Sequence, residues 1–164
     1  MAGIAPKRRV APAARGQRFA VVAARFNEPI SKKLLDGAVT ALADHAVTGP
    51  AVEVHWVPGS FELAQAARAL ARTGRFAGIV CVGAVIKGAT PHFEYVCSAA
   101  AQGIMRVGLD TGVPVTFGVI TALTEEQAWE RAGGAVGNRG EEAALAALEM
   151  AGWLRTLSGR RGKR

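Results

Sequence analysis

Apolar residues fall into two kinds of run along the chain. Four short runs rich in Val, Ile or Phe, at 19–24, 51–57, 78–86 and 113–121, are typical of β-strands. Between them, apolar residues recur every three or four positions, as in helices that bury one face. Strands that alternate with helices favour a parallel sheet with helices on both sides. The pattern therefore predicts an α/β fold, a three-layer α/β/α sandwich with a four-stranded parallel sheet, flavodoxin-like in type.

The helical spacing also predicts where each helix lies. The expected segments are 30–42, 63–70, 96–107, a short helix opened by a capping box at 124–127, and a last helix over 141–154. In the third segment Thr90 is expected as the N-cap, with Pro91 in the first turn. His92 then falls one turn before Val96, on the face expected to be buried.

Charge separates the ends of the chain from its body. Residues 1–18 and 155–164 each hold five basic and no acidic residues, which leaves ten basic and thirteen acidic residues for 19–154. The overall charge of +7 thus becomes −3 in the body. We expect a basic flexible N-terminal arm (1–18), one folded domain (19–154) and a basic C-terminal tail (155–164). No basic stripe with interleaved aromatics points to nucleic acid.

Composition narrows the class of protein further. The chain has 164 residues, half of them apolar, which suits one globular domain. No apolar run approaches the roughly 20 residues of a membrane span, and two cysteines without a C-x-x-C pair fit a reducing cytoplasm. The acid-free, Arg-rich start also resembles an organellar transit peptide. Three scattered histidines argue against a metal site.

Chemically useful side chains follow the predicted strands, where open parallel sheets bind ligands. Phe26 or Phe117 could stack on a planar heterocycle, and Glu62 could accept hydrogen bonds from polyol hydroxyls. The backbone N–H groups of 88–90, at a helix start, could hold a phosphate together with Arg131. Histidine titrates near neutral pH, so His92 is the natural proton donor and acceptor.

Each of these residues also has a purely structural interpretation. A lone histidine on an apolar helix face is more often packed in the core than catalytic. Phe26 and Phe61 could be hydrophobic plugs at the sheet edge, and Arg131 could be a solvated surface charge. The stretch 83–90 imitates a Walker A motif but has Ala89 where the phosphate-binding lysine must stand.

Five segments, taken in order, closely resemble the 6,7-dimethyl-8-ribityllumazine synthase family. They are RFNE (25–28), VPGSFE (57–62), GAVIKGATPHFEYV (83–96), PVTFG (114–118) and ERAG (130–133). The likeness spans about residues 19–153. It implies a transferase of riboflavin biosynthesis that condenses 5-amino-6-(D-ribitylamino)uracil with 3,4-dihydroxy-2-butanone 4-phosphate, releasing phosphate and water. No cofactor is implied.

The resemblance also implies a role for each site residue. The pyrimidine and ribityl chain would be bound by Phe26, Ser60, Phe61, Glu62, Phe117 and the backbone of Ala84, Val85 and Ile86. The phosphate would be held by Ala89, Thr90, Arg131 and Arg139, with His92 as the catalytic proton donor. The chain departs from the family at Lys87, Ala122 and Arg139, where arginine, threonine and lysine are usual, which leaves the phosphate contact of Arg139 open.

The same resemblance implies how the chain assembles into oligomers. Family members are homopentamers, pairs of pentamers or icosahedral capsids, with active sites shared between subunits. Phe117, Arg131 and Arg139 would then complete the pocket of the adjacent subunit. Small-molecule substrates and riboflavin synthase are the expected partners, and neither nucleic acid nor a membrane is expected.

Three rival functions stay open at this point. The chain could be a non-catalytic flavin- or nucleotide-binding module, which would not need His92. It could be a shell protein that has lost turnover, although the intact set of Phe26, Glu62, His92 and Arg131 speaks against this. It could also be an archaeal-type riboflavin synthase, which performs the next step.

Overall fold

A single parallel sheet forms the middle layer of the computed structural model, which describes residues 14–161. Its strands are β1 (Phe19–Ala24), β2 (Val52–Val57), β3 (Gly78–Ile86) and β4 (Val115–Ala122), in the order β2-β1-β3-β4. All three neighbouring pairs are parallel. The predicted strands were correct to within two residues at each end, and the α/β/α fold class is confirmed.

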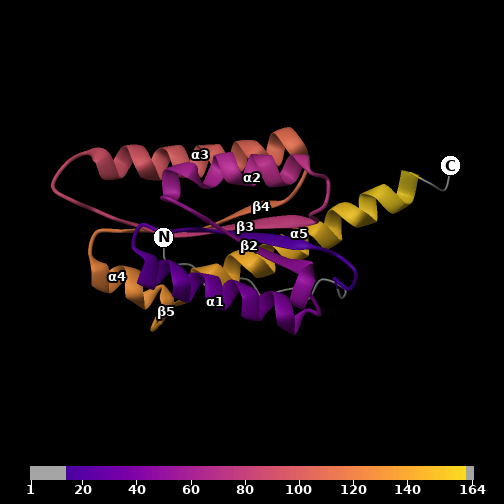
Figure 1. Cartoon of the computed structure of the whole chain (residues 1–164), viewed down its shortest axis with the longest axis horizontal. Helices are drawn as coiled ribbons and strands as arrows, with labels where there is room; N and C mark the ends of the chain where they lie inside the picture. Colours follow the sequence, from indigo (N-terminus) through magenta and orange to yellow (C-terminus); the bar gives the residue numbers. More distant parts are fainter. Residues whose placement is uncertain (1–13, 162–164) are drawn as a thin grey trace.

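Helices cover both faces of this sheet (Figure 1). On one face lie α1 (Glu28–Asp44), α4 (Glu125–Glu130) and α5 (Arg139–Arg161), and on the other lie α2 (Leu63–Arg72) and α3 (His92–Thr111). Two single turns, η1 (Gly49–Ala51) and η2 (Ser60–Glu62), flank β2. A small antiparallel hairpin of β5 (Ala132–Gly134) and β6 (Gly137–Asn138) joins α4 to α5.

The sheet separates two hydrophobic cores. Phe19 and Leu34 belong to the core beneath α1 and α5, while Leu63 and Ile104 belong to the core beneath α2 and α3. All four side chains are buried, and each stabilises the fold by about 1.5–3 kcal/mol relative to exposure. The first seven residues of β3 are buried as well, as its continuous apolar sequence predicts for a central strand.

The ends of two helices differ from their predicted positions. α3 begins at His92, with Pro91 at the N-cap and no side-chain cap, so the predictions of Thr90 as the N-cap and of Pro91 in the first turn were both wrong by one residue. At α4 the Thr124 hydroxyl accepts from Gln127 N at 3.3 Å as predicted. The Gln127 side chain, however, accepts from Leu123 N at 3.0 Å, one residue before the expected partner.

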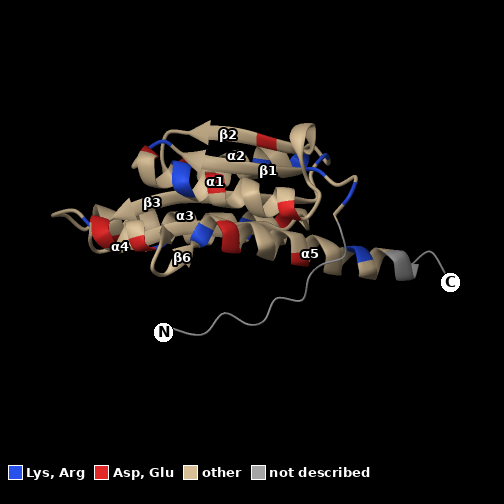
Figure 2. Cartoon of the chain, turned by 90° about the horizontal axis from the view of Figure 1, so that it is seen from below, with Lys and Arg blue, Asp and Glu red and all other residues tan. Residues whose placement is uncertain are grey.

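The last helix is longer than the predicted 141–154, because α5 runs from Arg139 to Arg161. Part of the expected C-terminal tail is therefore helical, and α5 extends past the folded body (Figure 2). Within the expected N-terminal arm, Ala14 is buried and Arg18 pairs with Glu53 at 2.5 Å. Residues 1–13, where a transit peptide would lie, are outside the described part of the chain.

Charged residues of both signs are interspersed along the helices of the body, as Figure 2 shows. This mixture agrees with the small net charge expected of residues 19–154. No helix among residues 14–161 is both long and apolar enough to cross a bilayer.

Candidate active site

The loops that follow β1 and β2 are joined by backbone hydrogen bonds. Arg25 N donates to Val57 O at 2.8 Å, and Phe26 N donates to Pro58 O at 3.0 Å. These bonds place Phe26 beside Gly59, where an added Cβ atom would lie 3.9 Å from the Phe26 Cβ. The Phe26 ring is 72% exposed. An aromatic ring held by its backbone but open to solvent can stack on a planar ligand.

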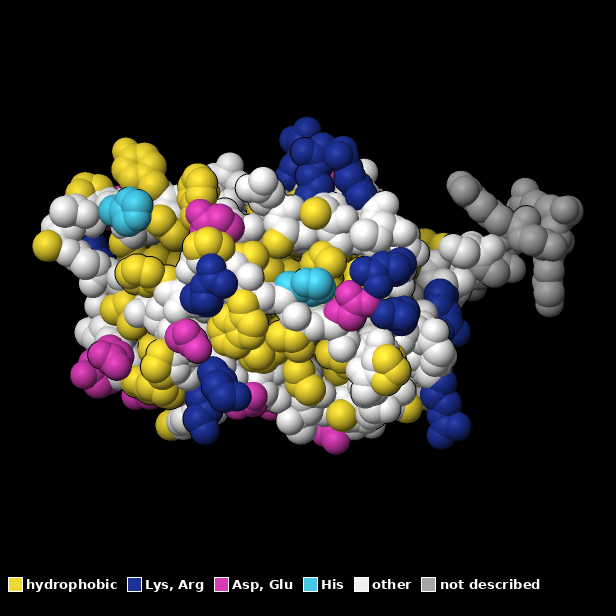
Figure 3. Space-filling model, in the orientation of Figure 1, with side chains coloured by type: hydrophobic (Ala, Val, Ile, Leu, Met, Phe, Trp, Pro, Cys, Tyr) yellow, Lys and Arg dark blue, Asp and Glu magenta, His cyan; other side chains and the backbone are white. Residues whose placement is uncertain are grey.

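The η2 turn brings an acid and a hydroxyl to the same edge. Glu62 Oε2 accepts from Gly59 N at 2.9 Å, which fixes the carboxylate beside the Phe26 loop. Ser60 is buried, and a Cβ added at Gly83 would lie 2.7 Å from its hydroxyl oxygen. Ser60 thus faces β3, whereas Phe61 is 61% exposed. Hydrophobic side chains are visible on the surface at the left end of Figure 3, the end at which β3 leads into α3 in Figure 1.

Strand β3 continues past the end of β1. The β1–β3 pairing ends at Ala23 and Val82, while β3 remains paired with β4 as far as Ile86 and Ala122. One side of the last residues of β3 is therefore left without a neighbouring strand in the described part of the chain. Such an open strand edge offers backbone donors and acceptors to a ligand.

The direction of each backbone group on this edge follows from the ladder. Ile79 N donates to Pro114 O and Lys87 N to Ala122 O, both toward β4. Because successive residues of a strand turn their polar groups to opposite sides, Ala84 and Ile86 face the open side and Val85 faces β4. Of the three residues expected to offer backbone groups to a ligand, only Val85 is directed away from this edge.

Asn27 joins the open edge to the Phe26 loop. Its side-chain Nδ2 donates to Ala84 O at 2.9 Å across 57 positions of sequence. Asn27 was not among the predicted site residues. The signal in the sequence was an asparagine between a strand and a helix, since asparagine tolerates the left-handed backbone that such turns require.

The connection from β3 to α3 carries His92, Ala89 and Thr90, and all three are exposed. The interpretation of His92 as a packed core group was therefore wrong, because the first buried residue of α3 is Ala100, more than two helical turns after His92. The backbone N–H groups nearest the positive end of α3 are those of His92 and Phe93, rather than those of 88–90. Lys87 Nζ lies 4.0 Å from Glu94 Oε1 across the connection.

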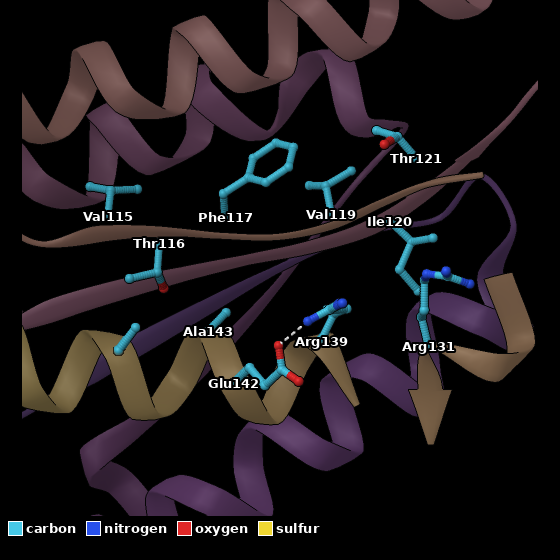
Figure 4. Close-up of a pocket in the computed structure, with 11 residues that line it drawn as sticks. Val115, Thr116, Phe117, Val119, Ile120, Thr121, Arg131, Arg139, Glu142 and Ala143 are labelled. Carbon is cyan, nitrogen blue, oxygen red and sulfur yellow. Dashed lines mark hydrogen bonds and ion pairs between the residues drawn. The ribbon is translucent and has the colours of Figure 1, made fainter. Parts of the chain in front are cut away.

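A cavity of about 680 Å³ lies at the other edge of the sheet, along β4. Its lining includes Phe117, Thr121, Arg131, Arg139 and Glu142, from β4, the end of α4 and the start of α5 (Figure 4). Two cations against one carboxylate give the lining a net positive charge. None of Ala89, Thr90 and His92 is among its lining residues.

Both arginines in the cavity are held in place. Arg131 Nη1 donates to Gln127 O at 2.9 Å, and Arg139 Nη1 forms a short ion pair with Glu142 Oε2. Their backbones are linked as well, because Arg139 N donates to Arg131 O at 2.9 Å. Arg131 is half-buried with a defined hydrogen bond, so it is not the free surface charge of the structural interpretation. Fixed guanidinium groups of this kind suit an anionic oxygen ligand.

Phe117 does not share the edge at which Phe26 and Glu62 meet. It pairs with Cys81, five residues before the final Ile86–Ala122 pair. At about 3.3 Å per residue this separates it by roughly 17 Å from the carboxyl end of the sheet. The expectation that all candidate residues converge at one edge therefore fails within a single chain. They form two groups: Phe26, Glu62 and the β3 end on one side, and Phe117, Arg131 and Arg139 along β4.

Comparison with known families identifies the family of the chain. A family model described as 6,7-dimethyl-8-ribityllumazine synthase matches residues 16–155. The chain belongs to the lumazine synthase family. The match covers the whole sheet and all the helices except the end of α5. Lumazine synthases act on small molecules in riboflavin biosynthesis and assemble as oligomers, and the family is one of transferases.

Other residues of this lumazine synthase family member lie near the site without having been predicted. Glu142 pairs with Arg139, and Thr121 lines the same cavity. Glu142 stands three residues after Arg139, a spacing at which opposite charges meet on a helix. That spacing was available in the sequence, but the helix was expected to begin only at residue 141.

The two thiols of this chain are unsuited to nucleophilic chemistry. Burial raises the pKa of Cys81 on β3 to about 12 and also raises the pKa of Cys97 on α3. Both therefore stay protonated at neutral pH. Among residues 14–161, no three His, Cys, Asp or Glu side chains gather as metal ligands would.

Proposed function

We propose that the chain condenses 5-amino-6-(D-ribitylamino)uracil with 3,4-dihydroxy-2-butanone 4-phosphate to form 6,7-dimethyl-8-ribityllumazine. The reaction releases phosphate and two waters. The observation that carries this proposal is the division of the site. An aromatic platform and an open strand edge suit a heterocycle, while a separate cavity with two fixed arginines suits a phosphate.

The pyrimidine would lie on Phe26, against the backbone of Ile86 at the open edge of β3. Glu62, fixed beside Gly59, would accept hydrogen bonds from ribityl hydroxyls. Phe61 would cover the same region. Ser60 is buried under Gly83, so we assign it to supporting the β3 end that the ligand meets.

The phosphate would bind Arg131 and Arg139 of one chain, together with Thr90 and the amide of Ala89 of a neighbouring chain. The ion pair with Glu142 keeps the Arg139 guanidinium oriented before substrate arrives. Each guanidinium can offer two parallel N–H donors to phosphate oxygens. Arginine at position 139, in place of the usual lysine, preserves the charge and replaces the three rotatable donors of an ammonium group with a planar fork of donors.

His92 would manage the protons of the reaction. Attack of the 5-amino group on the ketone gives a carbinolamine, which loses water to form an imine. Loss of the proton from the carbon next to the imine then expels phosphate by breaking its carbon–oxygen bond, and the enol that results tautomerises to a ketone. The ribitylamino nitrogen attacks this carbonyl and closes the ring with loss of the second water. Each step moves a proton to or from nitrogen or oxygen, and an exposed imidazole at a helix start can both donate and accept it.

A complete site would need two subunits. Phe117 stands roughly 17 Å from the β3 end within one chain, and β4 is the edge strand of the sheet. A second chain packed along β4 would bring its own β3–α3 connection to the cavity of the first. We propose a homopentamer built in this way, so that isolated monomers are inactive.

The test is to mix the purified protein with both substrates and follow lumazine absorbance against the spontaneous reaction. Acceleration with release of one phosphate per lumazine is expected. If lumazine forms at the spontaneous rate, the proposal is wrong, and a binding module or an inactive shell protein becomes the better interpretation. An archaeal-type riboflavin synthase would instead consume lumazine and form riboflavin.

Substitution of His92 by Ala tests the division of labour. Proximity of two bound substrates alone can supply several kcal/mol, and proton transfer typically adds about 10²–10⁴-fold. His92→Ala should therefore lower kcat by about 10²-fold yet remain faster than the spontaneous reaction. A fall to the spontaneous rate would show that positioning contributes nothing.

A further inference from the structure

Asn27 has a backbone conformation that most residues avoid. Its φ and ψ angles are 58° and 44°, in the left-handed region. Among residues 14–161 only Asn27 and Ala46 adopt positive φ without being glycine. Asn27 ends the loop after β1 and begins α1, where its carbonyl accepts from Ile30 N and Ser31 N, both at 3.1 Å. The sharp reversal of the chain at this position requires the unusual backbone.

The Asn27 side chain does not perform the usual task of an asparagine at a helix start. It makes no capping bond to α1. Its Nδ2 donates instead to Ala84 O, an acceptor on the side of β3 that β1 has ceased to cover. The amide thus takes the place of the next backbone N–H that a longer β1 would have offered. The amide occupies the Ala84 carbonyl on the open edge of β3, and the backbone groups of Ile86 on the same edge stay available to a ligand.

The same residue fixes the aromatic platform. Phe26 directly precedes Asn27, and its backbone is held by Pro58 O at 3.0 Å and by the Ser31 hydroxyl at 3.5 Å. Ser31 is itself buried on α1. The bond from Asn27 to Ala84 therefore ties the loop that carries Phe26 directly to the end of β3.

We propose that Asn27 is a positioning residue for the pyrimidine substrate, setting the separation between the Phe26 ring and the free edge of β3 at Ile86. This inference rests on the function proposed above. Asn27 acts through its neighbours and has no part in proton transfer. Its effect falls on binding of the planar heterocycle. Binding of the phosphate substrate is affected less, because the arginines proposed to hold it line the cavity along β4.

Two substitutions separate the backbone from the amide. Asn27→Gly accepts the left-handed conformation without steric strain but removes the donor. Asn27→Asp keeps the shape and tolerates the conformation but directs a carboxylate oxygen at the Ala84 carbonyl. Affinity for the pyrimidine should fall in the order Asn, Gly, Asp. Ala46→Gly is the matched control, because it places glycine at the other left-handed position, at the far end of α1.

The experiment measures binding of 5-amino-6-(D-ribitylamino)uracil by isothermal titration calorimetry, with the KM of each substrate beside it. Loss of one net hydrogen bond predicts about a 5-fold weaker Kd for Asn27→Gly, and the repulsive Asp variant about 10-fold weaker again. The KM of the phosphate substrate should change less than about 2-fold, and Ala46→Gly should bind as the unmodified protein does.

The result that would overturn the inference is an Asn27→Gly protein with unchanged pyrimidine Kd, or one in which both substrates weaken equally. Thermal unfolding of each variant shows whether a loss of binding is a loss of folding, and Asn27→Gly should melt within a few degrees of the unmodified protein. The unmodified protein separates the two proposals. If it fails to accelerate lumazine formation, the proposed function is wrong, whereas the order of Kd values decides the role of Asn27.

Discussion

Replacement of Asn138 by Ala should loosen the whole corner that holds the cavity arginines. Asn138 Oδ1 accepts from Gly140 N at 2.9 Å and Glu141 N at 3.1 Å, which caps the start of α5. Its Nδ2 donates to Lys33 O on α1 at 2.9 Å. One side chain thus ties the hairpin, α5 and α1 together beside Arg139.

The expected loss follows from these three bonds. Removal of an asparagine cap costs about 1 kcal/mol, and loss of the bond to Lys33 costs about 1 kcal/mol more. For a domain of this size, about 2 kcal/mol corresponds to a fall in Tm of about 4–8 °C. Because Arg139 N donates to Arg131 O at this corner, the KM of the phosphate substrate should also rise.

Asn138→Asp is the matched control. The carboxylate keeps both acceptor bonds but cannot donate to Lys33 O, and its repulsion from this carbonyl is offset by its attraction to the positive end of α5. About half of the fall in Tm is therefore expected. Scanning calorimetry at one protein concentration suits the comparison, since assembly alters Tm. The reasoning is refuted if Asn138→Ala melts within 1 °C of the unmodified protein, or if Asn138→Asp is destabilised as much as Asn138→Ala.

Three other predictions concern stability, reactivity and anion binding. A hydrogen bond from Arg75 lowers the pKa of Glu53 below its usual 4.5, so this contribution to stability is present above that pH and is lost as pH falls through the folded value. The Tm difference between the unmodified protein and Glu53→Gln should shrink as the pH falls from 6 to 3. A constant difference would show that ionised Glu53 does not stabilise the fold. Cys81, buried and with a pKa of about 12, should resist iodoacetamide at pH 8 in the native state and react in denaturant, as mass spectrometry can check. Arg131→Lys should raise the KM of the phosphate substrate about 10-fold and leave the pyrimidine Kd unchanged; equal effects on both would contradict the division of the site.

Much of the fold was predictable because its signals are local. The run from Gly78 to Ile86 is apolar at every position and rich in Val and Ile, a pattern typical of a strand covered on both faces. The four strands were placed within two residues for the same reason. The end of α5 was missed because the apolar periodicity of 141–154 fades before the helix does, and nothing local stops a helix at Leu154.

What the sequence alone determined is the fold class, the strands and the loops in which Phe26, Glu62 and His92 lie, because periodicity and composition act over a few neighbouring residues. Tertiary structure alone decided that Phe117 lies roughly 17 Å along β4 from the carboxyl end of the sheet and that His92 is exposed. It also decided that the Asn27 amide bonds to Ala84, 57 positions away. These relations depend on strand order, register and the point at which β1 stops. Side chains distant in sequence meet only after the sheet has paired, so no local pattern records them.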